Sequence, residues 1–114
     1  MDILLVDDEL DILESLQELF EDAGYEVVTA TDGAEALARL EDGEPPRVVI
    51  LDLLMPGVNG NEVYARMRRD VRLVDVPVII ATSDPSRAPR DVPVLRKPID
   101  TRRLLDVVRQ HCRG

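Results

Sequence analysis

The sequence predicts an α/β fold: a doubly wound, five-stranded parallel sheet with helices on both faces. Five short apolar runs alternate with four segments whose apolar residues recur at helical spacing. This alternation is typical of parallel sheets whose strands are buried on both faces. Right-handed crossovers leave few arrangements, and the strand order 2-1-3-4-5 fits best because the second run is the most polar and belongs at an edge.

The strands are expected at residues 3–6, 27–30, 48–51, 78–81 and 92–95. Helices are expected at residues 11–23, 34–41 and 61–71, and from the N-cap Asp100 onward, with Gly24 closing the first. The periodicity predicts these inward-facing residues: Ile12, Leu13, Leu16, Leu19, Phe20 and Ala23; Ala34, Leu37 and Ala38; Val63, Met67 and Val71; Leu104, Leu105 and Val108.

The segment between the fourth and fifth strands is rich in proline. Pro85 and Pro89 oppose a full helix, although Pro85 suits the first position of a single turn. The helix between strands 4 and 5 is therefore expected to be shortened or missing.

Length and composition limit the classes of protein that this chain can belong to. A chain of 114 residues predicts one domain, residues 1–114, with a single core. No apolar run approaches the ~20 residues of a membrane span, and the N-terminus has no basic leader, so we expect a cytoplasmic protein with no membrane partner. A net charge of −9 argues against direct nucleic-acid binding. Cys112, alone, excludes an internal disulfide.

Polar residues follow four of the predicted strands at the point where each strand ends. Asp7 and Asp8 follow the first strand, Asp52 the third, Thr82 the fourth, and Lys97 the fifth. The carboxyl ends of parallel strands share one edge of the sheet, and ligands bind there where the winding reverses, between strands 1 and 3. We therefore expect these five side chains to lie together.

Three neighbouring carboxylates repel one another unless a cation offsets their charge. Mg²⁺ is the natural candidate, because it takes oxygen ligands and commonly one or two carboxylates. Lys97, the only lysine beside 13 arginines, adds a compact ammonium charge. This set of groups favours phosphoryl transfer, with the Asp52 carboxylate as nucleophile.

Each of these residues also has a structural interpretation. Asp8 or Asp11 can cap the first helix, Asp52 can form a turn, Thr82 can be an ordinary strand residue, and Lys97 can be a surface lysine. The coincidence at four strand ends favours the functional interpretation, since the second strand, at the edge, contributes no such residue.

The chain resembles a response-regulator receiver domain of two-component signalling, a family with the flavodoxin-like strand order. The resemblance rests on the acidic pair in ILLVDDE, the segment DLLMPGVNG, the threonine of PVIIATS and the Lys-Pro of LRKPID. It implies that Asp52 accepts a phosphoryl group from a phosphohistidine of a sensor histidine kinase or histidine phosphotransfer protein. It also implies a signalling domain that acts on an unknown downstream protein, not a turnover enzyme.

The resemblance further implies a role for each site residue. Asp8, Asp52 and the backbone carbonyl of Leu54 would coordinate Mg²⁺, with Asp7 assisting through water. Thr82 would hydrogen-bond the phosphoryl group and Lys97 would pair with it. The Lys97–Pro98 peptide bond is commonly cis in this family.

Two features depart from the family pattern. Only 14 residues separate Thr82 from Lys97, too few for the usual helix, and Val94 stands where an aromatic residue often reports phosphorylation. Our hypothesis is that phosphorylation instead changes the loop from Ser83 to Val92.

Other functions remain to be weighed. A phosphorylation-independent protein-binding module with the receiver fold is the main alternative. A metal-dependent hydrolase with an Asp nucleophile is disfavoured, because Leu54 stands where many of those enzymes have a second Asp. A flavin carrier is disfavoured by the low aromatic content and by the absence of a Ser/Thr/Gly-rich phosphate loop after the first strand. Whether the chain acts alone or belongs to a longer regulator stays open.

Overall fold

Five parallel strands form the centre of the computed structural model, which describes residues 1–112. The strands are β1 (Ile3–Val6), β2 (Val27–Ala30), β3 (Val48–Leu51), β4 (Val78–Thr82) and β5 (Val94–Arg96). Their order is β2-β1-β3-β4-β5, which confirms the predicted topology. In the register of the sheet, Leu5 of β1 lies between Thr29 of β2 and Ile50 of β3.

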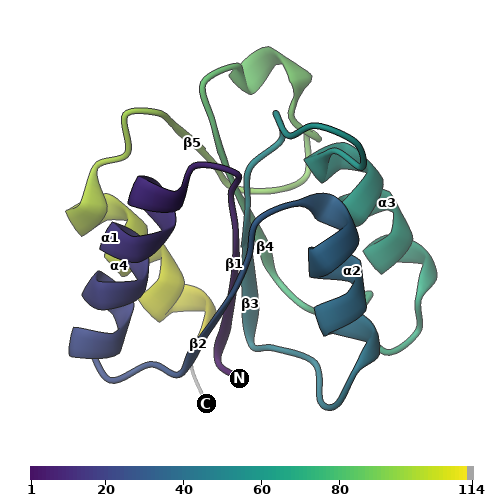
Figure 1. Cartoon of the computed structure of the whole chain (residues 1–114), viewed down its shortest axis with the longest axis horizontal. Helices are drawn as coiled ribbons and strands as arrows, with labels where there is room; N and C mark the ends of the chain where they lie inside the picture. The colour runs from purple at the N-terminus through teal and green to yellow at the C-terminus, as the bar shows by residue number, and fades with distance from the viewer. Residues whose placement is uncertain (113–114) are drawn as a thin grey trace.

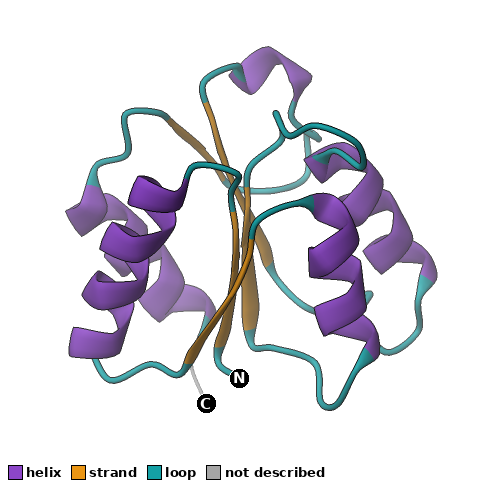
Figure 2. Ribbon diagram, viewed as in Figure 1, coloured by secondary structure: helices purple, strands orange, loops and turns teal. Residues whose placement is uncertain are grey.

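Two helices cover each face of the sheet (Figures 1 and 2). Helices α1 (Leu10–Asp22) and α4 (Thr101–His111) lie on one face, and α2 (Gly33–Glu41) and α3 (Gly60–Arg69) lie on the other. Successive strand residues point to opposite faces, so the chain builds two apolar layers. The first layer contains Leu5, Ile50 and Phe20, and the second contains Val6, Leu51 and Met67.

The segment between β4 and β5 contains only a short 3-10 helix, η1 (Pro85–Arg87). Asp84 caps this turn by accepting a hydrogen bond from the Ser86 N–H, and proline stands at its start, where no N–H is needed. The shortened helix predicted from the prolines is thus confirmed. On the α3 side of the sheet, the loop residues Ala88 and Val92 pack against the core, in the place that a longer helix would otherwise take.

The predicted helix faces were partly wrong. Helix α2 begins at Gly33 and buries Gly33, Ala36 and Leu40, which leaves Ala34 and Ala38 exposed and Leu37 half-buried. Alanine is small enough to lie on either the buried or the exposed face of a helix, so the spacing of the alanines could not show which face of α2 is buried.

The other errors lie at element ends. Ala23 and Val71 are exposed because each lies beyond the last residue of its helix, and Val71 is 89% exposed. Strand β5 starts at Val94 instead of residue 92, after Pro93, which has no N–H to donate to a ladder. Strand β4 runs one residue further than predicted, to Thr82.

In the part of the chain that the structure describes, no helix has the length and apolar character that a membrane crossing requires. Cys112 lies at the end of α4 and is buried in the first apolar layer.

Candidate functional site

Three carboxylates meet at the carboxyl edge of the sheet. Asp7 and Asp8 follow β1 and Asp52 follows the neighbouring β3, and each offers an oxygen within 4.8 Å of the other two. Asp7 and Asp52 are each 3% exposed, whereas Asp8 is open to solvent. Two buried acids beside one exposed acid form a set of hard oxygen ligands with an open side, which fits Mg²⁺ and its retained water molecules.

Lys97 reaches over these acids from the end of β5. Its Nζ lies 2.7 Å from Asp7 Oδ2, 3.4 Å from Asp52 Oδ2 and 3.6 Å from Glu9 Oε1. Burial alone would lower the pKa of Lys97, but the hydrogen bond and charge of Asp7, with the charges of Asp52 and Glu9, outweigh burial and raise it. The ammonium group is therefore held in its charged form.

Asp52 is held in one orientation by two contacts. Its Oδ1 accepts a hydrogen bond from the Leu54 N–H at 3.3 Å, and its Oδ2 faces Lys97. Burial raises the pKa of Asp52, Lys97 opposes this, and the charge of Asp7 raises it further. The folded site therefore disfavours the ionised form of Asp52. A second cation beside Asp7 and Asp8 would favour that ionised form.

Thr82 ends β4, next to β3, and is fully buried. Its Oγ1 accepts a hydrogen bond from the Asp84 N–H at 3.1 Å, which leaves the hydroxyl proton for another acceptor. The backbone carbonyl of Thr82 accepts a hydrogen bond from the Lys97 N–H at 2.9 Å, so the two residues are joined at the same rim.

Two features of the site were missed from the sequence. Glu9 pairs with Lys97, and its position directly after the acidic pair was the only indication in the sequence. The role of Gly60 was also missed. Gly60 is not needed for a positive φ, which occurs in this loop at Gly57, at 73°. A Cβ on Gly60 would instead clash with the Asp52 carbonyl oxygen, so Gly60 permits a close approach of α3 to the site.

The structure brings Asp7, Asp8, Asp52 and Lys97 together, with Thr82 at the neighbouring strand end. Leu54 lies two residues after Asp52 and is bonded to it through its N–H. The Lys97–Pro98 peptide bond is cis, as expected.

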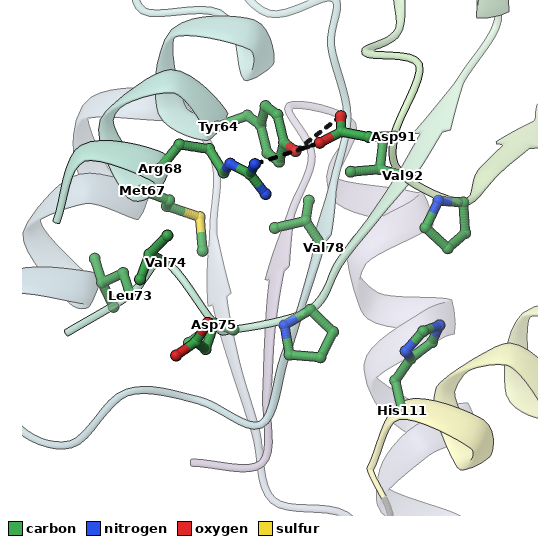
Figure 3. Close-up of a pocket in the computed structure, with 13 residues that line it drawn as sticks. Tyr64, Met67, Arg68, Leu73, Val74, Asp75, Val78, Asp91, Val92 and His111 are labelled. Carbon is green, nitrogen blue, oxygen red and sulfur yellow. Dashed lines mark hydrogen bonds and ion pairs between the residues drawn. The ribbon is translucent and has the colours of Figure 1, made fainter. Parts of the chain in front are cut away.

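A separate cavity of about 300 Å³ lies between α3 and the loop before β5 (Figure 3). Figure 3 shows the Tyr64 hydroxyl and the Arg68 guanidinium both directed at Asp91. The Tyr64 hydroxyl oxygen lies 3.0 Å from Asp91 Oδ2, and Arg68 Nη2 lies 3.5 Å from the same oxygen. Burial raises the pKa of Tyr64, and the hydrogen bond and charge of Asp91 add to this effect. None of the acids near Lys97 lines this cavity. The contacts of Asp91 with Tyr64 and Arg68 instead attach the loop before β5 to α3.

Comparison with known proteins agrees with this geometry. The family model described as the response regulator receiver domain matches residues 3–109. The chain belongs to this family.

Two response regulators of known structure have a similar fold. The chemotaxis response regulator CheY4 of Vibrio cholerae is 30% identical, with a TM-score of 0.86 over 95% of each chain. The response regulator TrrA of Thermotoga maritima, solved in complex with Mg²⁺ and beryllofluoride, is 34% identical, with a TM-score of 0.82 over 95% of this chain and 96% of that one.

Among curated proteins, the response regulator SaeR of Staphylococcus aureus is 40% identical over 81 residues, which are 71% of this chain and 34% of SaeR. The match therefore spans about a third of that relative's length.

Proposed function

We propose that residues 1–114 act as a single phosphoacceptor receiver domain of a two-component system. In this proposal Asp52 takes a phosphoryl group from a phosphohistidine of a sensor histidine kinase or histidine phosphotransfer protein, in an Mg²⁺-dependent reaction in the cytoplasm. The observation that carries the proposal is the meeting of Asp7, Asp8 and Asp52 within 4.8 Å beside the Lys97 ammonium group.

The acidic cluster suits a magnesium ion. Asp8, Asp52 and the backbone carbonyl of Leu54 would hold the ion, and Asp7 would reach it through water. When bound, Mg²⁺ offsets the charge of the carboxylates and of the phosphoryl oxygens. The related TrrA structure with Mg²⁺ and beryllofluoride supports this assignment.

Asp52, Lys97 and Thr82 would have different roles in the phosphoryl transfer. A carboxylate oxygen of Asp52 attacks phosphorus, the new P–O bond forms, and the P–N bond to the donor imidazole breaks with its electron pair going to nitrogen. Lys97 stabilises the negative oxygens of the transferred group, and the free Thr82 hydroxyl proton is available to one of them. Later attack by water on phosphorus breaks the P–O bond and restores the Asp52 carboxylate.

The phosphorylated domain would signal through the segment that replaces the usual helix. Thr82 Oγ1 accepts a hydrogen bond from the N–H of Asp84, which is the N-cap residue of η1. A hydroxyl that turns toward a phosphoryl group therefore acts on residues 83–92. Amide chemical shifts of these residues should change when Mg²⁺ and beryllofluoride are added, and an unchanged loop would contradict this part of the proposal.

Phosphorylation itself has a direct test. Incubation with acetyl phosphate and Mg²⁺ should add one phosphoryl group by intact-mass measurement, and EDTA or Asp52→Asn should abolish the gain. Asp11→Asn is the matched control, because Asp11 is an exposed acid of α1 outside the three-carboxylate cluster. Sustained hydrolysis of a phosphate ester over many turnovers would instead favour a hydrolase.

A phosphorylation-independent binding module is the second candidate. The observation that favours it is the shortening of the helix between β4 and β5 to a single 3-10 turn. Equal affinity of wild type and Asp52→Ala for a downstream partner, with or without phosphodonor, would support this alternative.

A further inference from the structure

Arg87 of η1 faces the same depression as the residues that follow Asp52. This depression, of about 180 Å³, is lined by Leu53, Leu54, Met55, Asn59, Asn61 and Arg87. Asp52 Oδ1 accepts a hydrogen bond from Leu54, whereas Oδ2 faces Lys97. Leu54 therefore links the acceptor carboxylate to this depression, because its N–H bonds to Oδ1 of Asp52 and the same residue lines the depression together with Arg87.

We propose that Arg87 is a ligand of the phosphoryl group: on phosphorylation its guanidinium leaves Asp84 and pairs with the phosphoryl oxygens on Asp52. This inference rests on the proposed function, because it needs the aspartyl phosphate to form. It adds a second protein cation to Lys97 and supplies it from the segment that replaces the helix.

The present partner of Arg87 holds it weakly. Arg87 Nε lies 3.1 Å from Asp84 Oδ2, and the two side chains are 67% and 39% exposed. Exposed ion pairs contribute little to stability, because water screens both charges. A phosphoryl group carries more charge and accepts two parallel hydrogen bonds from a guanidinium, so exchange toward it is favourable.

The exchange leaves the turn intact. Asp84 caps η1 through its other oxygen, Oδ1, which accepts hydrogen bonds from the N–H and hydroxyl of Ser86. Only the Oδ2 contact is lost when Arg87 departs. The guanidinium can therefore move without unfolding the turn that carries it.

The backbone of Arg87 is held near the site from two directions. Asn61 Nδ2, in the first turn of α3, donates to the Arg87 carbonyl at 3.0 Å. The Asp84 N–H, at the start of the same turn, donates to Thr82 Oγ1 at 3.1 Å. These tethers fix the base of the side chain while the exposed guanidinium stays free to turn.

Arg90 provides a matched control in the same loop. It is exposed, and no described residue forms an ion pair with it. Arg87→Ala and Arg90→Ala therefore remove the same charge from the same segment. A general effect of charge on an anionic ligand would appear in both variants, and a specific contact only in the first.

The experiment measures beryllofluoride affinity at saturating Mg²⁺ by isothermal titration calorimetry for wild type, Arg87→Ala, Arg87→Lys and Arg90→Ala. We expect about tenfold weaker binding for Arg87→Ala, typical of a lost charge-assisted contact, partial recovery for Arg87→Lys, and wild-type affinity for Arg90→Ala. Mg²⁺ affinity without beryllofluoride should be equal in all four. The Nε–H resonance of Arg87 should also shift when beryllofluoride binds.

Equal affinity of Arg87→Ala and wild type would overturn the inference while leaving the proposed function intact. An equal loss in Arg87→Ala and Arg90→Ala would overturn it too, because general electrostatics would then explain the effect. If wild type itself fails to bind beryllofluoride with Mg²⁺, the proposed function fails first, and the role of Arg87 fails with it.

Discussion

At the scale of single residues, the site is a balance between buried acids and one ammonium group. Lys97 contacts three carboxylates at once, which a compact ammonium achieves more readily than a planar guanidinium fork. This explains why the only lysine of an arginine-rich chain stands here.

Removing the charge of Asp52 should stabilise the metal-free protein. The fold holds the pKa of Asp52 above its ordinary value of 3.8, mainly through burial. The folded state therefore binds this proton more tightly than the unfolded state. Stability falls as pH rises from 3.8 through the folded pKa, and the loss persists at higher pH.

We therefore expect Asp52→Asn to unfold at higher urea concentration than wild type at pH 7, by about 1 kcal/mol, the common size of a single-residue effect. The difference should shrink below about pH 4, and Mg²⁺ should shrink it at pH 7 by stabilising only wild type. A less stable variant in EDTA at pH 7 would contradict the inference that burial of the ionised Asp52 destabilises the metal-free fold.

Loss of Lys97 should have the opposite effect. Lys97→Gln leaves Asp7 and Asp52 buried without their cation, and we expect a cost of about 2–3 kcal/mol in EDTA, below the full cost of breaking a buried pair because the site is open on one side. Since the folded pKa of Lys97 lies above 10.5, its contribution is complete below pH 10.5 and disappears as pH rises through the folded value.

Arg96→Gln serves as the control for Lys97, because Arg96 is the neighbouring exposed cation and no described residue pairs with it. Urea unfolding at pH 7 and at increasing alkaline pH should separate the two. Wild type should approach the stability of Lys97→Gln at high pH, and parallel pH curves would argue against this role for Lys97.

At this scale the sequence predicted which side chains lie close together wherever a strand end fixes their position, while the roles proposed for them stay predictions. Asp7, Asp8, Asp52 and Lys97 lie together because parallel strands bring their carboxyl ends to one edge. Glu9 could not be placed, because the path of the chain between a strand and its helix determines where the third acid points.

At the scale of elements, the first turns of α2 and α3 press against the loop that carries the site. A Cβ on Gly33 would meet the Val58 carbonyl oxygen, and one on Gly60 would meet that of Asp52. Such close approaches depend on tertiary packing, so periodicity cannot reveal them. The same limit explains the misassigned face of α2, where alanines fit either side.

Gly60→Ala should damage both stability and metal binding. The added methyl group would push α3 away from the Asp52 backbone, with an expected loss of about 1–3 kcal/mol and weaker Mg²⁺ binding. Gly57→Ala is the contrasting variant. Gly57 has φ of 73°, but a methyl group there would meet no atom within 4 Å, so the substitution strains only the backbone.

Calorimetric Mg²⁺ titration together with urea unfolding distinguishes these two glycines. We expect both variants to lose stability and only Gly60→Ala to lose Mg²⁺ affinity by several-fold. Equal Mg²⁺ affinity in Gly60→Ala and wild type would show that the close approach of α3 does not position the acids.

At the scale of the whole molecule, the strand order followed from alternation and handedness, and the shortened helix from two prolines. What the sequence could not show is how the remaining loop is fastened. Asp91 holds the loop to Tyr64 and Arg68 of α3, across 27 and 23 residues of chain. Such exposed polar contacts between distant segments follow no periodic pattern.

The whole fold should therefore depend on the ion that its acidic edge is proposed to hold. A ligand that binds only the folded state adds about 1.4 kcal/mol of stability when its concentration is ten times its Kd. With a net charge of −9, the chain also gains from any added cation, so Mg²⁺ must be compared with sodium at equal ionic strength.

We expect thermal unfolding of wild type to shift upward with Mg²⁺ beyond the sodium control. Asp8→Asn should lose this excess, because Asp8 supplies the exposed oxygen of the cluster, whereas Asp11→Asn should keep it. If Mg²⁺ and sodium stabilise wild type equally, the three carboxylates form no specific cation site, and the acids at the sheet edge would have to be tolerated through Lys97 alone.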